Sequence, residues 1–185
     1  MHETHKKPSE SDTRITELMI PAYANFGGKI HGGILLSLMD KVAYACATRH
    51  AETYCVTVSV ENVDFLAPVE VGDLVSMIAR VNYTGTSSMV VGIRVEAENV
   101  KEKVLKHTNT SYFTMVAKGD DGKPASVPGL LLTQPNDLRR YAEALTRKEL
   151  KQSHKDIMSE RIEAYNVGEE IRRLENHNCT VRLES

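Results

Sequence analysis

The sequence predicts an α+β fold in which an antiparallel sheet wraps around one long central helix and a helical extension follows. Residues 34–50 have the spacing of a helix that is apolar on most sides, and four segments with period-two alternation come directly after it. No helical pattern separates those segments, so a doubly wound parallel sheet is excluded, because parallel strands need a crossover between them. We therefore divide the chain into a disordered segment 1–14, a sheet-and-helix domain 15–131 and a charged helical extension 132–185.

The composition is that of a soluble globular protein. The 185 residues are 41% hydrophobic and 26% charged, with a formal net charge of -2. A charge so close to zero gives no electrostatic basis for binding nucleic acid or an anionic membrane. The three cysteines are Cys46, Cys55 and Cys179, and their odd number and wide spacing are typical of free thiols in a reducing compartment. No segment resembles a signal peptide or a membrane span. We therefore expect a cytoplasmic protein with no nucleic-acid or membrane partner.

The first predicted elements are a short strand, a glycine-rich loop and the central helix. Residues 1–14 are polar and lack periodicity, which predicts disorder. The segment RITELMI at 14–20 predicts a strand, and 21–33, with Pro21 and four glycines, predicts a loop. In the helix 34–50, one apolar stripe that should pack on the sheet consists of Leu35, Leu38, Met39, Val42 and Cys46.

Four strands are predicted after the helix. They are 56–65, 75–83, 89–97 and 106–118. In the first of them the alternation slips, which indicates a β-bulge near Asn62. In the extension, Pro135 and Asn136 predict the start of a helix, and Gly168 is expected to divide the helical region in two.

Asp40 is the one carboxylate between residues 25 and 50, and it lies at the margin of the apolar stripe. An unpaired acid that is partly removed from water is costly, so its presence there suggests a general base. The structural interpretation is an ordinary acid on the narrow polar face of the helix, paired with Lys41 or with a neighbouring strand. The pattern alone leaves both interpretations open.

The HGG segment at 31–33 lies at the start of the central helix. Backbone N–H groups of Gly32 and Gly33 would suit a negatively charged oxygen, which the helix dipole also favours. Alternatively, the glycines only permit the entry turn. His31 either lines such a site or is structural. Asn25 either orients a water or a substrate carbonyl, or forms a turn before the glycines.

No stronger catalytic motif competes with these residues. The sequence has no GxSxG elbow, no Walker loop and no HExxH pair, and its seven histidines are dispersed. We therefore expect no metal site.

Three blocks, IPAYANFGGKIHGGILLSLMDKVAYACATRH, VTVSVENVDFLAPVEVGD and YTGTSSMVVGIRVEAEN, resemble the hotdog-fold acyl-CoA thioesterases of the cytosolic (brain-type) acyl-CoA hydrolase family. The resemblance covers residues 15–131, and the blocks agree in order and spacing. In the family, an Asn of a P-x-x-A-N segment and an Asp of an L-M-D segment are associated with catalysis. These match Asn25 and Asp40, although Ala22 and Tyr23 stand where members often have acids.

The resemblance implies hydrolysis of acyl-CoA to a free fatty acid and CoA. Asp40 would act as a general base on water or as a nucleophile, while Asn25 would hold the water or the carbonyl. The backbone of Gly32 and Gly33 would bind the oxyanion. CoA is part of the substrate and product, and no metal or redox cofactor is expected. Ser87 and Ser88 match a turn of the family near which the CoA portion is expected, and His31 is expected to line the site. The phosphates of CoA need positive groups, for which Arg80, Arg94 and Lys118 are candidates by their positions on strands.

The resemblance also implies partners. Family members pair two hotdogs edge to edge, so Asn25 of one protomer would face Asp40 of the other, and a trimer of such dimers would give a hexamer. Two alternative functions stay open. One is a non-catalytic acyl-CoA-binding sensor module, and the other is a hydratase acting on 2-enoyl or 3-hydroxyacyl thioesters, in which His31 would have to serve beside an acid.

Overall fold

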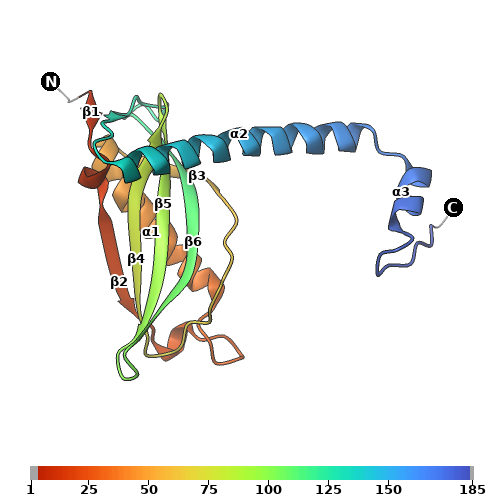
Figure 1. Ribbon diagram of the computed structural model, residues 1–185, viewed down its shortest axis with the longest axis horizontal. Helices are drawn as coiled ribbons and strands as arrows, with labels where there is room; N and C mark the ends of the chain where they lie inside the picture. Colours follow the sequence, from red (N-terminus) through yellow and green to blue (C-terminus); the bar gives the residue numbers. More distant parts are fainter. Residues whose placement is uncertain (1–3, 184–185) are drawn as a thin grey trace. The chain divides into compact units, whose positions relative to one another are not determined.

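The computed structural model describes residues 4–183 and confirms the predicted architecture. Five strands form one antiparallel sheet in the order β2-β4-β5-β6-β3, which curls around the helix α1 at Gly32–Ala51 (Figure 1). The bounds of the strands are Thr13–Leu18 for β2, Cys55–Val60 for β3, Leu74–Thr84 for β4, Ser88–Asn99 for β5 and Val104–Ala117 for β6. The two edges of the sheet are therefore β2 and β3.

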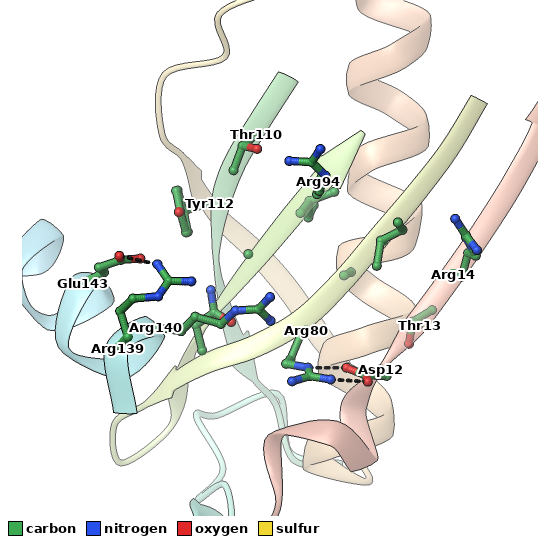
Figure 2. Close-up of a pocket in the computed structure, with 15 residues that line it drawn as sticks. Asp12, Thr13, Arg14, Arg80, Arg94, Thr110, Tyr112, Arg139, Arg140 and Glu143 are labelled. Carbon is green, nitrogen blue, oxygen red and sulfur yellow. Dashed lines mark hydrogen bonds and ion pairs between the residues drawn. The ribbon is translucent and has the colours of Figure 1, made fainter. Parts of the chain in front are cut away.

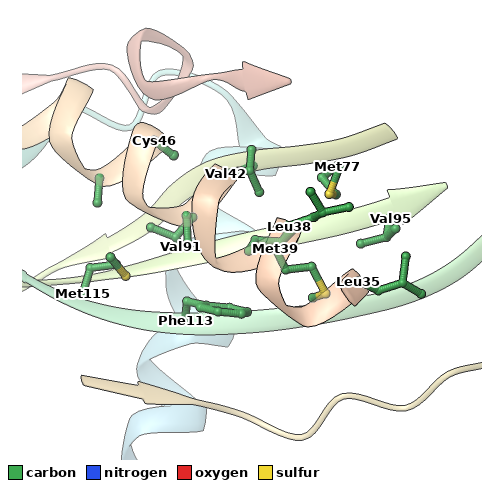
Figure 3. Close-up of a cluster of buried hydrophobic side chains, with 14 of the residues drawn as sticks. Leu35, Leu38, Met39, Val42, Cys46, Met77, Val91, Val95, Phe113 and Met115 are labelled. Carbon is green, nitrogen blue, oxygen red and sulfur yellow. The ribbon is translucent and has the colours of Figure 1, made fainter. Parts of the chain in front are cut away.

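The core lies between α1 and the inner face of the sheet, where alternation along each strand supplies every second side chain. On β4 the inward side chains, all at most 1% exposed, are Val75, Met77, Ala79 and Val81. The stripe predicted for the helix is buried as expected. Figure 3 shows it against strand residues that include Met77, Val91, Val95, Phe113 and Met115. Burial of this face decides which side of each strand points inward, and the residues between them point to the outer face.

β3 is shorter than predicted, and its irregularity comes earlier. The register between β3 and β6 shifts between Thr57 and Ser59, whereas the sequence predicts a bulge near Asn62. The strand ends at Val60. An extra residue at this point lets β3 bend away from the ladder, as bulges at sheet edges commonly do.

Residues 61–73 are irregular, so the prediction of a strand as far as residue 65 is wrong beyond Val60. This segment runs toward the start of α1, where the N–H of Ile30 donates to the carbonyl of Val69 at 2.9 Å. It stays beside β6 through separate backbone hydrogen bonds, from the N–H of Glu61 to the carbonyl of Tyr112 at 2.9 Å and from the N–H of Leu66 to that of Thr108 at 2.8 Å, and so forms no continuous ladder.

Residues 5–14 carry regular structure, where the sequence predicts disorder. β1 at His5–Lys6 pairs in parallel with β7 at Gly129–Leu130, and a 3-10 helix follows at Pro8–Ser11. The part of the prediction that falls on residues 1–3 lies outside the described residues.

Buried polar contacts hold this N-terminal segment. The Nζ of Lys6, a residue only 8% exposed, donates to the carbonyl of His50 near the end of α1 at 3.0 Å. The hydroxyl of Ser11 accepts from the N–H of Val81 on β4 at 2.9 Å. This bond extends the contact between the N-terminal segment and β4 beyond the pairing of β2 with β4. Because these partners are distant in sequence, the polar composition of the segment gives no sign of them.

The helix of the extension begins at Pro135, as predicted, but the break comes before Gly168. α2 spans Pro135–Glu163 and α3 spans Val167–Leu174, so the glycine lies in the first turn of α3. The side chain of Asn166 caps α3 by accepting from the N–H of Glu169 at 3.1 Å. The capping residue, rather than the glycine, therefore marks the break.

The chain has two compact units, the first ending at Ala144 and the second beginning at Leu145. The first turns of α2 thus belong to the unit of the sheet, whereas the predicted boundary precedes residue 132. Asp137 accounts for the difference. It is 6% exposed, and its carboxylate lies 3.5 Å from the guanidinium of Arg80 on β4, which ties the start of α2 to the sheet.

Candidate active site

Asp40 and Thr57 form a hydrogen-bonded pair beside one edge of the sheet. Asp40 lies on α1, and its Oδ1 accepts a hydrogen bond of 2.6 Å from the hydroxyl of Thr57 at the bulge of β3. Both residues are exposed, so the partial burial expected for Asp40 is not found within one chain. Within the described part of the chain, Asp40 has no ion pair with Lys41, and its partner is the strand residue.

The Asp40 carboxylate borders a cavity of about 350 Å³. The rings of Tyr44 and Tyr54 lie 6.1 Å apart and form one of its walls. Cys55 also lines the cavity, but burial raises the pKa of its thiol, so the thiol is protonated at neutral pH and is a poor nucleophile. Asp40 is therefore the candidate for acid–base or nucleophilic chemistry in this cavity. The complete lining is Asp40, Lys41, Tyr44, Tyr54, Cys55, Val56 and Thr57.

Asn25 shapes the loop before α1 and keeps its amide nitrogen available. It follows a 3-10 helix at Pro21–Tyr23, and its Oδ1 accepts hydrogen bonds from the N–H groups of Gly27 at 2.8 Å and Lys29 at 3.2 Å. The residue therefore forms the turn that the sequence allows. Its Nδ2 has no partner among the residues that the structure describes, so a water or substrate would meet Asn25 as a donor.

Only one of the two glycine N–H groups at the start of α1 is available. The N–H of Gly33 donates to Nδ1 of His31 at 2.9 Å, so His31 is the N-cap of the helix. The N–H of Gly32 has no partner within residues 4–183. A Cβ at Gly32 would lie 3.2 Å from the ring of Phe65, which favours glycine there. The structure thus leaves the Gly32 N–H, rather than the glycine pair, to meet a negatively charged oxygen.

These features form two half-sites that do not meet within one chain. We call them the donor half-site, made of Asn25 and Gly32, and the acid half-site, made of Asp40 and Thr57. Gly32 and Asp40 are eight residues apart on the same helix, which separates them by about 12 Å along its axis. A single water molecule cannot bridge that distance.

The sheet edge beside the acid half-site is apolar, and among the described residues no further strand lies outside β3. β3 is the outermost strand on this side, and its exposed side chains include Val58, at 59%, and Val60, at 40%. An unpaired strand edge presents free backbone N–H and C=O groups, and soluble proteins rarely leave an apolar one uncovered. This edge is therefore suited to pairing with another strand.

Ser87 and Ser88 lie at the turn between β4 and β5. Ser88 is opposite Val116 of β6, and Val116 is opposite Val56 of β3, which lines the cavity. The turn is therefore at the same end of the sheet as the acid half-site. Lys118, which directly follows β6, is at this end too.

Arg80 and Arg94 lie on the other face of the sheet. They alternate with the buried Ala79 and Ile93, so their side chains point away from α1 (Figure 2). Within one chain they do not join Asp40.

Thr57 is the site residue that the sequence does not reveal. In the segment CVTVSV every second residue is polar, so Thr57 and Ser59 are equivalent by pattern. The slip in alternation is the available signal, but it points to Asn62. Only the register of β3 against β6 directs Thr57 toward Asp40.

The described residues lack two kinds of feature. No group of three or more His, Cys, Asp or Glu side chains is arranged there to hold a metal ion. No helix within 4–183 is both long and apolar enough to cross a membrane.

The chain is similar to several known proteins. A model of the Thioesterase superfamily matches residues 27–104. The protein VdlD of Helicobacter pylori is 46% identical over 72% of this chain and 76% of its own length. The uncharacterized acyl-CoA thioester hydrolase YkhA of Bacillus subtilis is 32% identical over 79% of this chain and 85% of its own length. The cytosolic acyl coenzyme A thioester hydrolase of Rattus norvegicus is 30% identical over 75% of this chain, which spans 37% of that protein.

Solved structures are similar as well. An acyl-CoA hydrolase of Staphylococcus aureus, in complex with butyryl coenzyme A, coenzyme A and coenzyme A disulfide, has a TM-score of 0.77 and 32% identity, covering 86% of this chain and 98% of that one. An apo-hexameric acyl-CoA thioesterase has a TM-score of 0.79 and 34% identity, covering 82% of this chain and 97% of that one. Structures of three variants of the Staphylococcus aureus hydrolase are similar too. In each, one residue is replaced by alanine: an asparagine, an aspartate or a threonine.

Proposed function

The chain belongs to the thioesterase superfamily, and from this premise we propose that two protomers share an active site in which Asp40 of one and Asn25 of the other act on the thioester. The chain is an acyl-CoA thioester hydrolase with the hotdog fold, as the resemblance implies. The proposal for its residues rests on one observation. The Asp40 carboxylate, held by Thr57, borders a cavity, while the donors that a thioester carbonyl needs lie in the other half-site.

Asp40 supplies the base in this proposal. Its carboxylate takes a proton from water as the water oxygen attacks the thioester carbonyl carbon and forms a tetrahedral intermediate. The C–S bond then breaks, and the CoA thiolate leaves and receives the proton from Asp40. In a second route the carboxylate attacks the carbonyl carbon itself, expels the thiolate and forms a mixed anhydride, which water hydrolyses. The thiolate is a good leaving group, so either route needs less activation than the cleavage of an amide.

Asn25 and Gly32 supply the donors. The oxygen of Asn25 is already engaged by the N–H groups of Gly27 and Lys29, so its Nδ2 donates to the substrate carbonyl or to the attacking water. The N–H of Gly32 donates to the same carbonyl oxygen, where negative charge develops during attack. One donor of this kind is worth about 10²- to 10³-fold in rate.

A second copy of the chain brings the half-sites together. The apolar edge of β3 pairs with the same edge of a second protomer, which is the isologous contact of a two-fold dimer. Two complete sites then form, each with the acid half-site of one protomer and the donor half-site of the other. Three such dimers form a hexamer, and the similarity to an apo-hexameric thioesterase supports this assembly.

The spacing of the three proposed polar residues has a parallel in the Staphylococcus aureus hydrolase. The aspartate replaced in that enzyme lies 15 residues after the replaced asparagine, and the threonine lies 17 residues after the aspartate. Asn25, Asp40 and Thr57 have the same spacing. This supports a role for all three in one site.

Thr57→Val is expected to lower kcat by about 10-fold or more with little change in KM. The substitution keeps the shape of the side chain and removes a hydrogen bond to a carboxylate, an interaction worth about 1.5–3 kcal/mol. Thr57→Ser retains the hydroxyl and is expected to keep most of the activity. Steady-state kinetics on one acyl-CoA check both variants, and equal kcat in Thr57→Val and wild type would remove Thr57 from the site.

Release of free thiol from acyl-CoAs of increasing chain length tests the function directly. Steady turnover by the wild-type protein, with fatty acid and CoA formed in equal amounts, is the expected result. Binding of acyl-CoA without thiol release would instead indicate a sensor module. Hydration of a 2-enoyl-CoA with the thioester intact would indicate a hydratase.

We also propose a cytoplasmic location and no metal or redox cofactor, with CoA as part of the substrate and product. The name of the rat relative and the two buried free thiols, Cys46 and Cys55, support the location. Full activity after dialysis against a chelator is the result expected for the cofactor proposal.

A further inference from the structure

Phe65 lies over the start of α1, in the segment 61–73 that joins β3 to β4. This segment runs from the end of β3 toward the first turn of the helix (Figure 1). A Cβ on Gly32 would lie 3.2 Å from two carbons of the Phe65 ring, so the ring is close to the backbone that carries the available N–H of the donor half-site. That half-site therefore has an aromatic neighbour that its polar groups do not require.

Backbone hydrogen bonds fix the position of Phe65, although its side chain is half-exposed. The N–H of Leu66 donates to the carbonyl of Thr108 on β6 at 2.8 Å, and the N–H of Ile30 donates to the carbonyl of Val69 at 2.9 Å. The segment is thus tied both to the sheet and to the residues just before α1. Phe65 is 50% exposed, so one side of its ring remains open. A ring that is held in this way can define the shape of a site.

The clearance between the Phe65 ring and α1 is narrow. Carbon atoms in ordinary contact are about 3.5–4.0 Å apart, so a methyl group at the Cβ position of Gly32 would be too close to the ring. A carbonyl oxygen that accepts from the N–H of Gly32 approaches the same turn of the helix, which brings the carbonyl carbon and its substituents up to the ring. An unbranched acyl chain needs less room there than a chain with a methyl group next to the carbonyl.

Leu36 continues the apolar surface along α1. Gly32, Leu36 and Asp40 follow one another at four-residue spacing, so they lie on one face of the helix. Leu36 comes about 6 Å after Gly32 along the axis. It is 38% exposed, whereas its neighbour Leu35 is buried. An acyl chain whose carbonyl oxygen is bound by Gly32 can therefore contact the Phe65 ring first and Leu36 next.

The CoA arm of the thioester has different requirements, because it carries phosphates and amides. The hydroxyl and positive groups expected near CoA are those of Ser87, Ser88 and Lys118, which lie at the end of the sheet that holds the acid half-site. In the proposed shared site, that end belongs to the protomer that supplies Asp40. The apolar surface of the other protomer, which supplies the donors, then holds the acyl arm.

We propose that Phe65 contacts the substrate and makes the hydrolase select unbranched acyl groups. Its ring packs against the acyl carbons next to the thioester carbonyl and leaves no room for a methyl branch on the first of them, C2. This inference rests on the proposed function, because it places the carbonyl oxygen on the N–H of Gly32. It adds a specificity-determining residue on the segment between β3 and β4.

The ratio of kcat/KM for butyryl-CoA to that for 2-methylpropionyl-CoA tests the proposal. The two acyl groups have the same atoms and differ only in branching at C2, so effects on CoA binding cancel in the ratio. The wild-type protein is expected to favour butyryl-CoA by at least about 10-fold, the effect of one methyl group that a site cannot accommodate. Phe65→Ala opens the space beside Gly32 and is expected to lower the ratio to about 3 or less.

Matched variants separate the shape of the ring from folding and from catalysis. Phe65→Leu keeps an apolar side chain of smaller size and is expected to give a ratio between those of the wild type and Phe65→Ala. Tyr165→Ala removes a 66% exposed aromatic ring between α2 and α3 and is expected to keep the wild-type ratio and rates. Asp40→Asn is expected to slow both substrates equally, because the acid acts on the carbonyl group that they share. Melting temperatures show whether each variant is folded.

Two results would overturn the inference and leave the proposed function intact. One is hydrolysis of both substrates by the wild-type protein with equal kcat/KM. The other is a wild-type ratio in folded Phe65→Ala. By contrast, a wild-type protein that released thiol from neither substrate would contradict the proposed function, and this inference with it.

Discussion

Asp40→Asn is expected to lower kcat for acyl-CoA hydrolysis by about 10²- to 10⁴-fold. Asparagine has the shape of aspartate and still accepts the hydrogen bond from Thr57, but its amide neither takes a proton from water nor attacks a carbonyl carbon. The loss therefore reports chemistry rather than folding. Free-thiol release measured over a range of acyl-CoA concentrations separates the change in kcat from any change in KM.

Asp120→Asn is the matched control for this variant. Asp120 is an exposed acid in the turn after β6, so the substitution makes the same change of atoms and charge outside the half-sites. It is expected to have wild-type kinetics. If Asp40→Asn kept wild-type turnover with an unchanged melting temperature, the base or nucleophile would have to be another residue.

Co-expression of Asp40→Asn with Asn25→Asp is expected to restore about a quarter of wild-type activity, although each variant alone is nearly inactive. Asn25→Asp keeps the oxygen that holds Gly27 and Lys29 but loses the donor. In a mixed dimer one site carries both substitutions, whereas the other carries neither. Half of randomly formed dimers are mixed, so about one site in four is intact.

The control for this experiment replaces Asn25→Asp by the double variant Asn25→Asp/Asp40→Asn. Co-expressed with Asp40→Asn, it cannot form a site that contains the Asp40 carboxylate, so no activity is expected. Activity is measured on material purified by two different tags, which selects mixed assemblies. If those assemblies were as inactive as each variant alone, the two half-sites would not be shared between protomers.

The helix and strand pattern of the central domain was open to prediction because it depends on local periodicity. Leu35, Leu38 and Met39 recur at helical spacing, and Val75 and Met77 alternate, so each element carries its own core face. Packing then only had to bring these faces together. The structure of the N-terminal residues could not be predicted in this way. Lys6 is held by the carbonyl of His50, which is distant in sequence, and such a contact produces no periodic pattern in the sequence.

The candidate site was predictable only in part. Asn25 and Asp40 stand in short motifs of the family, so their identities could be proposed from neighbouring residues. Thr57 could not, because the register of β3 against β6 aims it at Asp40. Likewise, only the structure reveals that His31 occupies the N–H of Gly33 and leaves that of Gly32 available.

By itself, the sequence determined which faces are apolar, the order of helix and strands, and the two polar residues that motifs identify. Tertiary structure alone decided that Asp40 is held by Thr57, that the donors lie about 12 Å along the helix from the acid, and that Arg80 and Arg94 line a cavity on the outer face of the sheet. The physical reason is the distance along the sequence over which each kind of interaction acts. Burial patterns repeat every two to four residues along the chain, whereas hydrogen-bond partners and charge clusters depend on distances between segments that exist only after packing.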